Sequence, residues 1–184
     1  VAGLNMVSRS VLGNAAHAVA VMVWHPIPAA ESKASLPLLG MSMFGVTTPC
    51  VEQLRALYDG VFEPLVFHAT GTGGQSLEKL IDSGVITRVM DVTLTEVCDL
   101  FMNGVFSAGP DRMGAIIRTK IPYTASVGAL DMVNFGAMPT VPQEYKHRKL
   151  HVHNANVTLM RTTTEENEAM RRWLGETLNQ CEGK

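Results

Sequence analysis

The stretch EPLVFHATGTGGQSLEKLI, residues 63–81, combines in one place the features that decide the fold. An apolar run that includes Leu65 and Phe67 leads into a turn rich in glycine and threonine. Apolar residues at helical spacing then follow. This order is typical of a buried β-strand that leads through a tight turn into an α-helix. The stretch therefore predicts one strand and helix unit of an α/β fold.

The same order recurs along the rest of the chain. Apolar runs lie at residues 38–46, 63–69, 86–93, 105–109, 121–130 and 156–160, and helical patterns begin within residues 47–54, 70–81, 94–101, 110–117 and 162–174. Alternating strands and helices favour right-handed crossovers and a parallel sheet that is covered on both faces. We therefore predict a doubly wound, mostly parallel, Rossmann-like α/β domain over residues 38–184. Its last helix, Thr164 to about Asn179, would leave the sheet incomplete at the C-terminal end.

Three segments do not follow this pattern. Residues 1–25 carry apolar residues every three or four positions, which predicts an amphipathic interdomain helix. Residues 26–37 have prolines near both ends and predict a flexible linker. Residues 131–154 include a basic cluster from Lys146 to Lys149, and this segment predicts a long functional loop or a helix that the pattern does not separate.

The composition excludes several classes of protein. With 184 residues, of which 46% are apolar and 17% are charged, the chain can bury a sizeable core and is not intrinsically disordered. The net charge of −2 without long charged runs provides no basic surface for nucleic acid. Polar residues interrupt the first apolar segment, so we expect neither a signal peptide nor a membrane span.

The cysteines indicate the compartment. Cys50, Cys98 and Cys181 form no CxxC pair and cannot all be paired within one chain. This favours a reducing environment, so we expect a cytoplasmic protein. The first residue is Val1 rather than Met, which indicates a processed chain or a fragment.

The candidate ligand-binding residues follow the predicted strands. In open parallel sheets, ligands bind beyond the carboxyl ends of the strands. The three glycines of residues 68–74 can aim backbone N–H groups at one anion, although a plain tight turn would have the same sequence. We therefore predict a cleft for an anionic small molecule or a nucleotide. The candidate residues are Thr47, Thr48, His68, Thr70, Gly71, Thr72, Gly73, Gly74, Thr95, Glu96, Asp131, Asn134, Arg161 and Thr162.

Three residues are candidates for catalysis. Glu96, in the first turn of a helix that Thr95 would cap, is the carboxylate best placed for acid–base work opposite His68. Cys50 would lie in the first turn of a helix that begins at Thr47 or Thr48, where a helix dipole activates a thiol. The alternative for Cys50 is an inert structural residue, which is the more common role of a free cysteine.

Two further interpretations stay open. His151 and His153 would point the same way on an extended segment, but no third ligand follows at a recognised spacing, so we predict no metal site. An enzymatic or ligand-binding domain should bring His68, Glu96 and Asp131 together in a concave site. A protein-interaction module should instead expose an apolar patch.

Four longer motifs allow a comparison with a known family. They are FGVTTPC (44–50), LVFHATGTGG (65–74), SVGALDMVNFG (126–136) and VTLMRTTTEE (157–166). In this order they resemble the family of the tomato mosaic virus resistance protein and its bacterial and fungal relatives. The resemblance implies that this chain is the second α/β domain of a longer protein. A nucleotide-binding domain would precede it, further strands would follow it, and some relatives add a barrel domain.

The resemblance also implies ligands and partners. ATP is the implied cofactor, held mainly by a glycine-rich loop of the preceding domain. The plant member is an inhibitor that binds a viral replication protein, which makes a protein partner the alternative. Leu94 stands where relatives tend to have a third threonine, which weakens that loop as a phosphate contact. No reaction is implied. We also expect the chain to self-associate, or to be held by a partner domain, through its first helix and its sheet edge.

Overall fold

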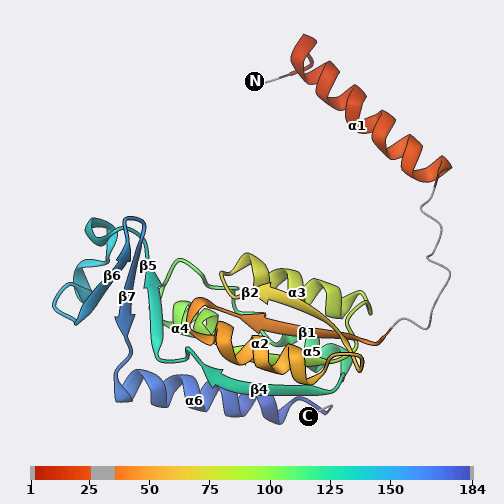
Figure 1. Cartoon of the computed structure of the whole chain (residues 1–184). Coiled ribbons are helices and arrows are strands. Elements are labelled where there is room, and N and C mark those ends of the chain that lie inside the picture. The colour runs from red at the N-terminus through yellow and green to blue at the C-terminus, as the bar shows by residue number, and fades with distance from the viewer. Residues whose placement is uncertain (1–2, 26–35, 183–184) are drawn as a thin grey trace. The chain divides into compact units, whose positions relative to one another are not determined.

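The computed structural model describes residues 3–25 and 36–182. Helix α1 (Met6–Trp24) belongs to one compact unit, and the residues from Leu36 onward belong to another. Figure 1 shows the helices and strands of both units. Most of the linker predicted at residues 26–37 lies outside the described residues.

Helix α1 is apolar on more than one side. Its start is held by Asn5, whose side-chain oxygen accepts hydrogen bonds from the N–H groups of Val7 at 3.0 Å and Ser8 at 3.1 Å. Val11 and Leu12 are both exposed and, as consecutive residues, point about 100° apart. The predicted helix is present, but its apolar surface is wider than a single stripe. By length and composition it could cross a membrane, a property that leader sequences and the core helices of larger proteins share.

Four parallel strands form the main sheet of the second unit, in the order β2-β1-β3-β4. Strand β1 (Leu38–Met43) lies between β2 (Glu63–His68) and β3 (Val89–Thr93), and β4 (Tyr123–Gly128) pairs with β3. The chain builds outward on one side of β1 and then on the other, which creates a topological switch point between β1 and β3. The predicted doubly wound α/β fold with a parallel sheet is therefore confirmed.

Helices cover both faces of this sheet because alternate residues of a strand point to opposite sides. On one face, Leu39 and Met41 of β1 lie in the same buried cluster as Val51 of α2. On the other face, Val89 of β3 lies in a larger cluster with Leu77 of α3. The helices of this unit are α2 (Thr48–Leu57), α3 (Thr72–Asp82), α4 (Thr95–Met102), α5 (Gly114–Thr119) and α6 (Thr164–Asn179).

A second, antiparallel sheet follows the last parallel strand. Its order is β5-β7-β6, with β5 at Met132–Phe135, β6 at Leu150–Asn154 and β7 at Val157–Arg161. Two short 3-10 segments, Met138–Thr140 and Gln143–Tyr145, connect β5 to β6. The carboxyl ends of the parallel strands point toward this second sheet (Figure 1).

The structure corrects three predictions in this part of the chain. Residues 131–154 are not one long loop, because β5 and β6 both pair with β7. Residues 156–160 do form a strand, but it is antiparallel and outside the main sheet. Residues 105–109 form no strand, because the N–H groups of Val105 and Phe106 donate instead to the carbonyl of Asn134 and the carboxylate of Asp99.

Candidate functional site

Two adjoining cavities lie between the carboxyl ends of the parallel strands and the second sheet. Their volumes are about 310 Å³ and about 540 Å³, and they share Val46, Met132 and Leu159 in their walls. Both volumes fall in the range of roughly 300–1,000 Å³ that is typical of small-molecule sites. We call the two cavities together the strand-end groove.

The smaller cavity has an aromatic wall. Parallel pairing of Met43 with His68 places Phe44, the residue after β1, beside His68 at the end of β2. The rings of Phe44 and His68 stack with centroids 5.3 Å apart, and Phe106 meets Phe44 edge-on at 6.2 Å. Polar groups come from Thr70 and from β6. The remaining lining residues are Gly45, Val46, Met132, His153, Asn154, Val157 and Leu159.

The larger cavity carries charged groups. Arg161, at the end of β7, forms an ion pair with Asp131, and Lys149 and His151 line the same cavity from the start of β6. Among the residues that the structure describes, Lys149 makes no ion pair. Its neighbour Arg148 is already bound to Glu166 at 2.8 Å. The groove therefore offers one cation, Lys149, without a protein counterion in the described part of the chain.

The groove contains only some of the candidate residues. His68 and Thr70 line the smaller cavity, and Asp131 and Arg161 line the larger one. Cys50, a free thiol, is exposed on α2 and lines neither cavity. The other candidates outside the groove are Thr47, Thr48, Gly71, Thr72, Gly73, Gly74, Thr95, Glu96, Asn134 and Thr162.

Three of the threonine candidates serve the protein interior more than a ligand. Thr47 is buried, and its hydroxyl lies 2.7 Å from that of Thr93 instead of capping α2. Thr48 donates to the carbonyl of Phe44 at 3.1 Å. Thr162 is buried and donates to Asn167 at 2.9 Å. Their hydroxyl groups therefore hold the ends of β1, β3 and β7 in place.

The glycine-rich turn holds an anion, but this anion is a side chain of the protein. The N–H groups of Gly71 and Gly74 donate to Oε1 of Glu96 at 2.8 Å and 3.1 Å. Gly71 has a φ of +82°, a conformation that favours glycine. A Cβ atom on Gly73 would lie 1.9 Å from the carbonyl oxygen of His68, so Gly73→Val cannot leave this turn intact. Two donors that we expected to bind an external ligand are thus used internally.

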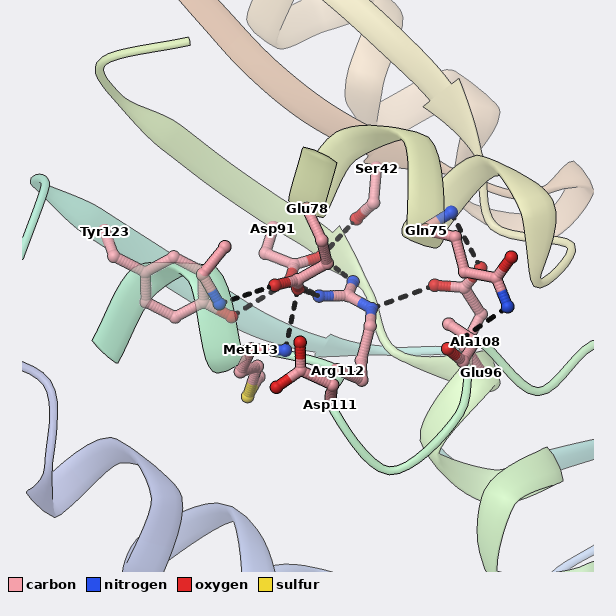
Figure 2. A network of polar contacts seen from close by, with 12 residues as sticks. Ser42, Gln75, Glu78, Asp91, Glu96, Ala108, Asp111, Arg112, Met113 and Tyr123 are labelled. Carbon is pink, nitrogen blue, oxygen red and sulfur yellow. Dashed lines mark hydrogen bonds and ion pairs between the residues drawn. The ribbon is translucent and has the colours of Figure 1, made fainter. Parts of the chain in front are cut away.

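Glu96 is one of three buried carboxylates around Arg112. The Arg112 guanidinium lies 3.3 Å from Glu78, 2.8 Å from Asp91 and 2.9 Å from Glu96. Figure 2 shows Arg112 with Asp91 and Glu78 on one side and Glu96 on the other. Tyr123 completes the cluster by donating to Asp91 at 2.9 Å. We call these five residues the Arg112 cluster. The sequence does not reveal this cluster, because its members lie in different elements and form no local motif.

The Arg112 side chain stays charged in spite of its burial. Burial raises the pKa values of Glu78 and Glu96, against the lowering effect of the Arg112 charge. Burial also disfavours the charged form of Arg112, but the charge and hydrogen bond of Asp91 outweigh it and hold the Arg112 pKa well above its usual value. Through Glu96, this cluster anchors the glycine-rich turn that carries Thr70 into the groove. We therefore interpret Glu96 as a positioning residue.

Asp99 holds a second buried network, which contains two more of the candidates. Its carboxylate accepts hydrogen bonds from the N–H groups of Asn134 and Phe106, both at 2.8 Å. The Asn134 amide group also donates to Thr95 at 2.8 Å. Burial raises the pKa of Asp99 to about 7. The side chains of Asn134 and Thr95 therefore join α4 to β5. As a result, Asn134 does not lie at the rim of the strand-end groove, and Thr95 begins α4 without capping it.

The expected convergence of His68, Glu96 and Asp131 does not occur. His68 and Asp131 line different cavities, and Glu96 is buried in the Arg112 cluster. His151 and His153 both face the groove, as expected for alternate residues of a strand. Within residues 3–25 and 36–182, no group of three side chains is arranged to hold a metal ion.

Comparison with known proteins identifies relatives of this chain. A UPF0261 protein of Rhizobium meliloti is 58% identical over 99% of this chain, which corresponds to 45% of that relative. A UPF0261 protein of Clostridium tetani is 49% identical over 98% of the chain, again 45% of the relative. The tomato protein named ToMV resistance protein Tm-1 is 45% identical over 98% of the chain and 24% of its own length.

These relatives, together with a match to one domain model, assign the chain to a family. The chain spans less than half of the length of its bacterial relatives. Residues 36–184 match the C-terminal domain of the uncharacterised protein family UPF0261, which begins where the α/β unit begins. The resemblance to the tomato resistance protein is thereby confirmed. This chain belongs to the UPF0261 family and includes its C-terminal domain.

Proposed function

We propose that this domain binds an anionic small molecule in the strand-end groove. The observation that carries the proposal is the position of Lys149 and Arg161 in one cavity, beyond the carboxyl ends of a doubly wound sheet. Ligands of such sheets bind at these ends. A carboxylate or phosphate of the ligand would provide Lys149 with the counterion that it lacks among the described residues.

The proposal concerns binding and does not name a reaction. His68 and His153 face the smaller cavity and could exchange a proton with a bound molecule. A nucleotide such as ATP is one anion that fits the proposal, with further contacts from other parts of a longer protein. The free thiols of Cys50 and Cys98 suit a reducing compartment, and we propose the cytoplasm as its location.

Lys149→Ala should weaken the binding of ribose 5-phosphate and of AMP by about tenfold, because it removes one charged hydrogen-bond donor. Isothermal titration calorimetry on the 184-residue chain measures both affinities. Lys146→Ala is the matched control, since Lys146 is exposed nearby and does not line the groove. Unchanged affinity in Lys149→Ala, or no binding of either anion to the unmodified chain, would contradict the proposal.

The edge of the main sheet favours a second candidate function, a protein-interaction module. Residues 124–127 of β4 are exposed, with Val127 at 72%, and none is charged or a proline. Charges and prolines are the usual means by which edge strands avoid pairing. A cavity of about 310 Å³ lies beside this edge, lined by Val127 and by Leu174 of α6. We propose that a second copy of this chain pairs its own β4 with this edge.

Val127→Lys should convert a dimer of this kind into a monomer, because it places a charge on the pairing edge. Sedimentation velocity over a range of protein concentrations measures the change. Val85→Lys is the control, since Val85 is exposed in the loop before β3 and does not belong to β4. Val11→Asp tests α1 as the alternative contact. An unmodified chain that stays monomeric at every concentration would rule out self-association.

A further inference from the structure

We propose that the ligand of the strand-end groove carries a flat aromatic or heteroaromatic ring next to its anionic group. The ring would occupy the smaller cavity against Phe44 and His68, and the anionic group would occupy the larger cavity near Lys149. This inference rests on the proposed function and adds the chemical class of the ligand.

The smaller cavity is built from flat and apolar surfaces. The rings of Phe44 and His68, which both line this cavity, stack with an interplanar angle of only 26°. Phe106 lies edge-on beside them. Aromatic rings favour offset-stacked or edge-on contacts with centroids about 4.5–7 Å apart, so a ligand ring can repeat the contacts that these side chains already make. The aliphatic side chains of Val46 and Val157 belong to the same cavity.

These rings are accessible from the cavity. His68 is exposed and Phe44 and Phe106 are partly buried, so aromatic surface remains in contact with solvent. Two of the six phenylalanines of the chain line this one cavity. Covering apolar surface of this kind is favourable, and ligand sites commonly combine an apolar wall with a few polar groups that orient the ligand. Thr70, His153 and Asn154 provide polar groups here.

The distance between the two halves of the groove limits the ligand further. His151 lines the larger cavity and His153 the smaller one, and both belong to β6. Two residues along a strand span roughly 7 Å. The ring and the anionic group should therefore be joined by a short linker. Nucleoside monophosphates and arylalkyl carboxylic acids both have this chemistry.

Matched pairs of probes distinguish the ring from the anionic group. AMP is compared with ribose 5-phosphate, and 3-phenylpropanoate with 3-cyclohexylpropanoate, by calorimetry on the 184-residue chain. We expect the aromatic member of one pair to bind about fivefold to tenfold more tightly than its non-aromatic partner. A preference for AMP identifies the ligand as a nucleotide, and a preference for 3-phenylpropanoate identifies it as an aromatic acid. Equal affinities within both pairs would overturn this inference and leave anion binding intact. Failure of all four probes to bind would overturn both proposals.

Variants in the aromatic wall test the same inference from the protein side. Phe44→Leu and Phe106→Leu keep apolar bulk but remove ring surface, so each should reduce the preference for the aromatic probe by at least about threefold. Affinity for the non-aromatic probe should change by less than about twofold. Phe101→Leu is the control, because Phe101 packs on Trp173 outside the groove. A preference that is unchanged in both wall variants would contradict the inference, and melting curves verify that each variant is folded.

Discussion

Replacing Arg112 with methionine should destabilise the protein by about 3–5 kcal/mol, because the substitution leaves buried carboxylates without their shared countercharge. Arg112 is 2% exposed, and Glu78, Asp91 and Glu96 all lie within 3.3 Å of its guanidinium. Urea denaturation at neutral pH measures the change. For a chain of this size, the melting temperature should fall by roughly 10–15 °C.

A matched substitution of an exposed arginine shows how much of the stability loss depends on burial of the ion pairs. Arg118 also binds two carboxylates, those of Asp82 and Asp111, each at 2.8 Å, but its side chain is 46% exposed. Arg118→Met should therefore cost at most about 1 kcal/mol, because water screens these ion pairs. An equal loss of stability in the Arg118→Met and Arg112→Met variants would show that the Arg112 cluster is not the anchor that its geometry indicates.

The pH dependence of the Arg112→Met variant provides an independent check. Burial already raises the pKa values of Glu78 and Glu96, and these values should rise further when the Arg112 charge is lost. The difference in stability between the variant and the unmodified protein should therefore shrink as the pH falls and these carboxylates become neutral. A difference that stays constant with pH would indicate that packing, and not charge, accounts for the loss.

Asp99 should make the protein less stable as the pH rises from about 4 to about 7. Its folded-state pKa of about 7 lies above its ordinary value of 3.8, so the folded protein binds the proton more tightly than the unfolded chain. The stabilising contribution is therefore fully present below about pH 4 and is lost as the pH rises through 7. Three pKa units correspond to about 4 kcal/mol as an order of magnitude.

Asp99→Asn isolates this contribution from those of other titrating groups. The asparagine keeps the size of the side chain but does not titrate, so the loss of stability between about pH 4 and pH 8 should be smaller in the variant. Unfolding in urea at both pH values measures that difference. Asp59→Asn, at an exposed position, should leave the loss of stability between these pH values unchanged. A loss of stability in Asp99→Asn equal to that of the unmodified protein would show that Asp99 is ionised throughout this range.

Several elements could be predicted from the sequence because their signals are local. The helix predicted from Thr164 to Asn179 is present with these bounds. Its start is held by the reciprocal hydrogen bonds of Thr163 and Glu166, residues three positions apart in the chain. The strand and the helix within residues 63–81 could be predicted equally well, because hydrophobic periodicity and glycine-rich turns are signals that extend over only a few residues.

Other features could not be predicted, because they depend on contacts that are distant in sequence. The three carboxylates that bind Arg112 lie 16, 21 and 34 residues away from it along the chain for Glu96, Asp91 and Glu78. The partner of β5 is β7, and the sequence between them has the composition of a loop. Both the second sheet and the Arg112 cluster therefore depend on pairing that no local pattern encodes.

The sequence by itself determined the α/β class of this protein and the edge of the sheet at which the candidate site lies. The order of strands and helices follows from local periodicity, and parallel strands necessarily end at one edge. Only the tertiary structure decided which polar groups face the groove and which are buried. Glu96 and Asn134 follow strands or lie near their ends, as His68 and Asp131 do. Glu96 and Asn134 are nevertheless buried, because Glu96 binds Arg112 and Asn134 binds Asp99. The direction of a polar side chain depends on the partners that folding brings to it, because a buried polar group must find a hydrogen bond or a counterion.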